Sequence, residues 1–259
     1  MGAPRAFLEL AADRPNAFVV LRLCDVAPNG ESLLITYGAL NLTHRNGHKA
    51  VELLEPGRRY SIQMDLNNIA FSLAPGHRLR LAISTSYWPI IWPSPEPVTL
   101  TVFAGGKTRV QLPVRPACPA DAKLSAFGPP EQAEAVPYSV IRIPRRGRLA
   151  VTTEIQSGET RVVSSRDRAA YRLPTINLEH SSSGEDIHRI QRGDPLSARS
   201  ETHRSVSYTR DTWHVRVDTA TVLTSTRDAF VVTAELDAYE GSERVATRRW
   251  DVRIPRQGV

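Results

Sequence analysis

The motifs that mark the common catalytic sites are absent from this sequence. In enzymes with a nucleophile elbow, the catalytic serine lies in the motif Gly-x-Ser-x-Gly, at a sharp turn between a strand and a helix. No serine of this chain has glycines at both of these positions. Neither Gly-x-Gly-x-x-Gly nor a phosphate-binding loop occurs. The sequence therefore predicts no catalytic residue and no cofactor.

Histidines and carboxylates with suggestive spacing have plainer explanations. His44 and His48 are four residues apart, but the His-Glu-x-x-His pattern of a zinc-binding helix is missing and Asn46-Gly47 marks a turn. We expect surface histidines and no metal site. Glu235 and Asp237 share one face of a predicted strand, which is typical of a solvated face rather than of an acid–base pair.

The charge of the chain argues against nucleic acid as a partner. The net charge is +6, but residues 1–119 carry 12 basic and 8 acidic side chains and residues 120–259 carry 21 and 19. The excess is spread thinly and forms no stripe that could follow a phosphate backbone. No apolar run is long enough to span a membrane and no signal peptide opens the chain, so we expect a cytoplasmic location. Cys24 alternates with apolar neighbours and is predicted to be a buried, inert thiol.

Alternating polar and apolar residues predict an all-β protein. About eight short strands separated by Gly and Pro turns fit before residue 115, which favours a jelly-roll (galactose-binding-like) β-sandwich over residues 1–115. The clearest predicted strands are Phe18–Val26, Ser32–Leu40, Arg59–Leu66, and a pair formed by Val98–Phe103 and Thr108–Val114 around Gly105-Gly106-Lys107.

Residues 116–137 are rich in proline without a usable period, and we interpret them as a linker. Residues 138–259 are predicted to form a second antiparallel β domain, a meander that closes into a sandwich or a partial barrel, because its strands are long and its turns short. Tyr171–Asp194, which contains His188, is polar and irregular, so we expect surface loops there.

The segment LAPGHRLRLAISTSYWPIIWPSP, residues 73–95, carries the candidate binding residues. Gly76 permits a turn into a strand on which Arg78 and Arg80 project opposite Leu79, Leu81 and Ile83, so that both arginines can reach a carboxylate of a partner. Prolines then stiffen a loop that contains Tyr87, Trp88 and Trp92. Two hypotheses remain open: the tryptophans dock a partner, or they fold back onto their own core.

Five short motifs occur in an order and spacing that resemble one known family. They are Gly2-Ala3-Pro4, the segment Leu23–Gly30, the segment Gly38–Arg45, Leu54-Glu55-Pro56-Gly57, and the segment Pro75–Leu81. Together they resemble the C-terminal jelly-roll domain of the X-Pro dipeptidyl-peptidase and cocaine-esterase family of serine hydrolases. Residues 116–259 are similar to an extra C-terminal stretch of some bacterial members.

The resemblance implies a partner rather than an activity. Members of this family combine an α/β-hydrolase domain that holds a Ser-Asp-His triad, a helical cap and the jelly roll, so the triad belongs to a part that would precede Met1. We therefore expect this chain to be inactive alone and to form the non-catalytic part of an esterase or peptidase. Its catalytic domain is expected either upstream in a longer chain or as a separate polypeptide.

Two alternatives come from other functional classes. A jelly roll can bind carbohydrate on loop aromatics, and Tyr87, Trp88 and Trp92 could stack on a sugar ring, although no cluster of Asp, Asn and Gln lies beside them in the sequence. A purely structural or homo-oligomeric β protein is the third possibility.

Overall fold

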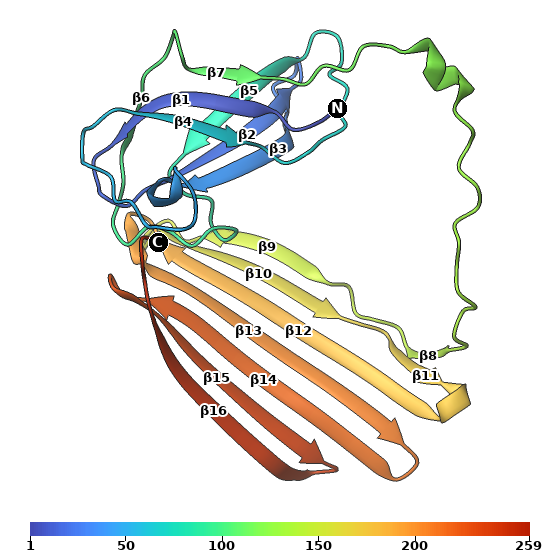
Figure 1. Cartoon of the computed structure of the whole chain (residues 1–259). Helices are drawn as coiled ribbons and strands as arrows, with labels where there is room; N and C mark the ends of the chain where they lie inside the picture. The colour runs from blue at the N-terminus through green and yellow to red at the C-terminus, as the bar shows by residue number, and fades with distance from the viewer. The chain divides into compact units, whose positions relative to one another are not determined.

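The computed structural model describes residues 1–259 and confirms an all-β architecture (Figure 1). It contains 16 strands and three short 3-10 helices, and none of these helices has the length and apolar character needed to span a membrane. The chain forms two compact units, residues Met1–Leu124 together with Gln257–Val259, and residues Ser125–Arg256.

Two antiparallel sheets build the first unit as a sandwich. In one sheet β1 (Arg5–Ala12) pairs with β4 (Tyr60–Asp65) on one side and with β6 (Leu100–Val102) and β7 (Arg109–Gln111) on the other. In the other sheet β2 (Phe18–Val26) lies between β3 (Ser32–Asn41) and β5 (Arg78–Ser84). Two 3-10 helices, η1 (Leu42–His44) and η2 (Pro119–Lys123), complete this part of the chain.

One hydrophobic core holds the two sheets together. Because side chains alternate between the faces of a strand, every second residue of β1, β2 and β4 points between the sheets. The resulting cluster contains Ala6, Leu8, Leu10, Val19, Leu21, Leu23, Ile62 and Met64, with Leu81 and Ile83 of β5 packed against it. The predicted inward face of β5 is thereby confirmed for these last two residues.

Three details of the first unit differ from the sequence-based predictions. Seven strands precede residue 115 rather than about eight. β6 and β7 do not pair with each other, because both continue along the same side of β1 and the Gly105-Gly106 turn between them forms a bulge. Thr108 closes this bulge: its hydroxyl accepts from the Glu9 N–H at 3.1 Å and donates to the Phe103 carbonyl at 2.7 Å.

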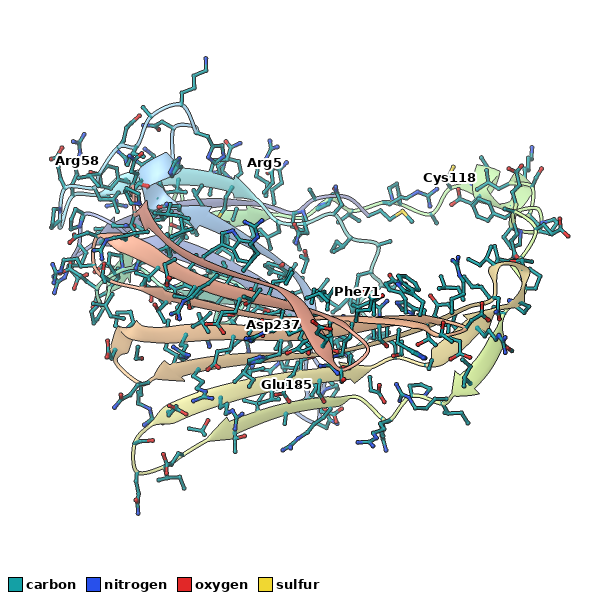
Figure 2. All side chains as sticks on the ribbon, turned by 90° about the horizontal axis from the view of Figure 1, so that it is seen from below. Arg5, Arg58, Phe71, Cys118, Glu185 and Asp237 are labelled. Atoms are coloured by element: carbon teal, nitrogen blue, oxygen red, sulfur yellow. The ribbon has the colours of Figure 1, made fainter.

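Cys24 is half-buried rather than buried. In register it lies between Leu34 of β3 and Arg80 of β5. Its side chain therefore points to the outer face of the sheet, opposite the core residue Leu23. The alternation of polar and apolar residues correctly predicted that Cys24 lies in a strand. It did not predict which face of that strand packs against the core. Cys118, the other thiol, is exposed just before η2 (Figure 2).

The second unit is one antiparallel sheet of nine strands, so the predicted antiparallel meander is confirmed (Figure 1). The sheet stays open between β16 and β9 and does not close into the expected sandwich or partial barrel. Its main path runs β16 (Glu243–Pro255), β15 (Ala229–Glu240), β14 (Trp213–Ser225), β13 (Asp194–Arg210), β12 (Leu178–Gln191), β10 (Glu159–Asp167) and β9 (Arg148–Thr153). Off this path, β11 (Ala170–Leu173) pairs with both β12 and β8 (Ser139–Arg142), and η3 (Pro174–Ile176) follows β11.

The prediction of surface loops over Tyr171–Asp194 is wrong. Most of this stretch is β11, η3 and the long strand β12, whose residue His188 lies opposite Ser200 of β13. β12 reads LEHSSSGEDIHRIQ and has no apolar alternation. Its backbone groups are nevertheless paired with β10 and β11 on one side and β13 on the other, so the strand needs no apolar face to form.

Asp167 ties the loop after β8 to the end of β10. Its carboxylate accepts from Arg142 Nη1 at 2.6 Å and Nη2 at 2.9 Å, and from the Arg145 backbone N–H at 2.9 Å. The hydrogen bonds from Arg142 and then from Arg145 lower the pKa of Asp167 from its usual 3.8 to about 2.

This pKa predicts an acid-sensitive attachment of β8. Because the pKa is lower in the folded state, the folded chain favours the carboxylate, so the stabilisation is complete above about pH 4 and is lost as the pH falls toward about 2. We expect the melting temperature of the wild type to fall over this window more steeply than that of Asp167→Asn. Parallel slopes for the two proteins, measured by thermal denaturation at pH 2–5, would contradict the assignment.

The proline-rich stretch is proposed to be the junction between two independently folded parts. The border between the compact units follows Leu124, and residues 126–138 are exposed and form no strand or helix. We therefore expect limited trypsin digestion to cut first at Lys123, and to leave two resistant fragments. Protection of this bond under conditions that cleave other exposed sites would count against a separate junction.

Candidate docking surfaces

An apolar groove of about 470 Å³ opens on the surface of the first unit. It lies at the start of β5 and includes residues from the chain start and from the segment after β7. Six of its apolar side chains are between 39% and 84% exposed: Met1, Phe71, Leu73, Leu79, Leu112 and Val114. A contiguous apolar surface of this kind is typical of an interaction site.

The groove is built on a turn that the sequence predicted in part. Gly76 has φ of +80°, as the predicted turn requires, and the His77 N–H donates to the Ala74 carbonyl at 3.2 Å. His77 Nδ1 then lies 2.8 Å from Oδ1 of Asp25, a buried carboxylate at the end of β2. Since Asp25 is in register with Leu79, this contact fixes the start of β5 and the position of Leu79 in the groove.

Sequence reasoning missed the groove and the role of His77. The available signal was an acidic residue inside the apolar strand FVVLRLCDV, which needs a buried partner. A second signal was the run of Phe71 and Leu73 in a segment without strand periodicity.

Arg78 and Arg80 lie on the outer face of the sheet, opposite the face on which Leu79 lines the groove. They are in register with Val26 and Cys24 of β2, and both are exposed. No carboxylate lies within ion-pair distance of either side chain in the chain. The structure thus places these two predicted residues together on one exposed face of β5.

The aromatic loop, residues 85–99 between β5 and β6, places the other three predicted residues. The Tyr87 ring packs edge-on against Tyr37 of β3 at 5.3 Å, and the Arg22 guanidinium lies 5.3 Å from its centre. The rings of Trp88 and Trp92 pack edge-on at 5.3 Å. All three aromatic side chains are half-buried, whereas Ile90 at the tip is 58% exposed. The loop is therefore partly folded onto its own sheet, between the two alternatives that the sequence left open.

A second, polar groove of about 590 Å³ crosses the sheet of the second unit. Register places Glu185, His203, Ala220 and Glu235 in one row across four strands, and Asp218 and Asp237 in the next row. Glu235 and Asp237 thus share a face, as predicted. Each also pairs with an arginine, Arg249 and Arg244 respectively, at 3.5 Å, as expected for a solvated face.

One serine–histidine contact occurs in the sheet of the second unit. Ser200 Oγ lies 2.9 Å from His188 Nδ1 across β12 and β13. The neighbouring acid, Asp186, accepts two hydrogen bonds from Arg204, at 2.7 and 2.9 Å, and one from Thr202 at 2.9 Å. Burial alone would raise the pKa of Asp186, but these hydrogen bonds outweigh it and lower the pKa. The carboxylate is committed to Arg204, so this arrangement is structural.

Comparison with known families identifies the first unit. Residues 1–119 match the family model described as the X-Pro dipeptidyl-peptidase C-terminal non-catalytic domain. This part of the chain is similar to that family. The match confirms the resemblance carried by the five motifs, and it makes residues 1–119 an accessory domain of the kind that accompanies a catalytic hydrolase domain.

Similarity to solved structures is more distant. The chain is similar to the crystal structure of an aminopeptidase from the marine sediment archaeon Thaumarchaeota archaeon, with 19% identity and a TM-score of 0.38. The similarity covers 41% of this chain and 21% of the aminopeptidase, so this chain spans about a fifth of that protein. Comparison with curated proteins gives no match.

Proposed function

We propose that this chain is the non-catalytic C-terminal part of an α/β-hydrolase-family serine esterase or peptidase, in which it braces the catalytic domain and shapes its pocket. The observation that carries the proposal is the family match over residues 1–119. The absence of Gly-x-Ser-x-Gly from the chain agrees with it, because the nucleophile must then come from another domain.

The surfaces of the first unit support a protein partner. The apolar groove offers exposed leucine side chains that a sandwich alone has no need to leave in water. Arg78 and Arg80, on the opposite face of β5, can pair with carboxylates of the catalytic domain and thereby fix its orientation. We assign bracing to the groove and these arginines, and pocket shaping to the aromatic loop, whose exposed tip is Ile90.

Carbohydrate binding is less well supported. A sugar platform needs an open aromatic face, but Tyr87 already packs against Tyr37 and lies under Arg22. The geometry of the loop therefore favours a protein partner over a sugar.

The tryptophans of the aromatic loop provide a test of the docking role. Both rings are half-buried, so Trp88→Ala and Trp92→Ala should each cost less than the about 3–5 kcal/mol of a fully buried tryptophan, and part of that cost is the about 0.5–1.5 kcal/mol of the edge-on aromatic pair. We expect both variants to weaken association with the catalytic domain, since tryptophans are frequent interface anchors.

The control is Trp213→Ala, which removes a more exposed tryptophan (43%) from β14 of the second unit. Thermal melts and titration against the catalytic domain measure the two effects separately. Large losses of stability in both loop variants, or affinities equal to that of Trp213→Ala, would show that the tryptophans serve the fold alone.

A further inference from the structure

β16 presents a free sheet edge. It pairs with β15 on one side only, and all 13 of its residues are exposed. The backbone groups of an edge strand can hydrogen-bond a further strand, and natural proteins usually blunt such edges or use them for association. The other end of the sheet, β9, is much shorter, Arg148–Thr153.

The two faces of β16 carry different chemistry. Arg248, Trp250, Val252 and Ile254 share one face, and the three apolar residues are 45%, 45% and 48% exposed. On that face they continue the row of Ala234, Val232 and Phe230 of β15, with which they are in register. The opposite face carries Arg249 and Asp251, whose charged groups lie 3.3 Å apart.

The charge pattern of β16 is complementary to itself. When an edge strand pairs with its own copy about a two-fold axis normal to the sheet, both strands run antiparallel and each residue faces a residue on the same side. An axis at Trp250 places Arg249 opposite Asp251 of the second copy, twice, and Trp250 opposite Trp250. Axes at Arg248, Arg249 or Asp251 instead oppose like charges directly, which is destabilising. An axis at Val252 opposes Asp251 to Arg253, but it uses only residues 249–255 of the strand.

The regular part of the strand has the right extent for this axis. A register shift between Ala238 and Tyr239 of β15 displaces the start of β16, so that regular pairing begins at Ala246 and continues to Pro255. An axis at Trp250 uses this whole regular stretch, pairing Ala246 with Ile254 of the second copy. The apolar faces of the two sheets then become continuous, and the tryptophan rings meet at the axis.

We propose that β16 is a homodimerisation edge, at which two copies of this chain pair antiparallel about Trp250 and join their sheets. The occupant is a second copy rather than another protein because the strand matches itself in charge and in apolar face. The pairing is independent of the catalytic partner proposed above.

Charge reversal of the full chain tests the proposal. Arg249→Asp places the introduced carboxylate opposite Asp251 of the second copy, and Asp251→Arg places the introduced guanidinium opposite Arg249, so each single variant should be monomeric. The double variant R249D/D251R restores opposite charges and should dimerise again. The control is Arg148→Asp on β9, at the other edge of the sheet, which should remain dimeric.

Sedimentation equilibrium of the wild type should give twice the chain mass of 28.7 kDa. For each single variant, the dissociation constant of the dimer should be at least tenfold higher than that of the wild type. Circular dichroism establishes that each variant is folded. A monomeric wild type at hundreds of micromolar, single variants that dimerise like the wild type, or a folded double variant that stays monomeric would each overturn the proposal.

Discussion

Aspartate substitutions in the apolar groove, Leu73→Asp together with Leu112→Asp, are expected to weaken association with the catalytic domain by about 100-fold or more. Full burial of a leucine side chain is worth about 1.5–3 kcal/mol, and the roughly 40% of each side chain that is still exposed accounts for about 0.6–1.2 kcal/mol of this on docking. The two leucines together therefore correspond to about one to two orders of magnitude in the dissociation constant. A carboxylate buried against an apolar partner adds a desolvation cost.

Both positions are already partly exposed in the chain, so the fold itself should tolerate the change. The matched control is Leu53→Asp, which introduces the same charge at a 59% exposed leucine of the first unit that does not line the groove. Titration calorimetry with the catalytic domain compares the three proteins. If the affinity of the double variant agreed with that of Leu53→Asp within a factor of three, the groove would not be part of the interface.

Leu21→Ala is expected to destabilise the first unit by about 2–5 kcal/mol. Leu21 is fully buried in the middle of β2, where it lies between Gly38 of β3 and Ile83 of β5 and packs into the core between the two sheets. Truncation leaves a cavity there that a close-packed sandwich can fill only in part. Because β5 carries Leu79 and both candidate arginines, this variant should also dissociate from the catalytic domain at a lower temperature than the wild type does.

The control for this variant is Leu33→Ala, a 61% exposed residue of β3 whose truncation should change stability by no more than about 0.5 kcal/mol. Chemical denaturation of the full chain, followed by tryptophan fluorescence in a W213F/W250F background so that only Trp88 and Trp92 of the first unit report, measures the difference. A cost below about 1 kcal/mol for Leu21→Ala would mean that β2 is not the centre of the core.

Local sequence patterns predicted some of the strands, but not the strands that lack a pattern or the way in which strands pair. β2 was predicted with its observed bounds because its apolar run is closed by the turn at Asn29-Gly30. The sequence did not predict β12, because its side chains do not alternate between polar and apolar residues. The strand forms because its backbone groups hydrogen-bond to neighbouring strands. Strand pairing is also a tertiary property, so the shared use of β1 by β6 and β7 could not be read from the glycines between them.

The same distinction applies to the candidate site. Arg78 and Arg80 could be predicted from alternation alone, because a strand face needs only the period of the strand. The groove could not, since Met1, Leu73 and Leu112 are distant in sequence and meet only after the sheets pack. The contact between His77 and Asp25 likewise depends on the register of β5 against β2.

The most direct test of the accessory role is titration of the purified chain with the α/β-hydrolase catalytic domain that its own genome encodes upstream or nearby, with ester hydrolysis measured alongside. The account predicts saturable one-to-one binding per chain, a change in kcat/KM of the catalytic domain, and no hydrolysis of p-nitrophenyl acetate by this chain alone. Absence of binding, or turnover by this chain alone that a serine-directed phosphonate abolishes, would contradict it.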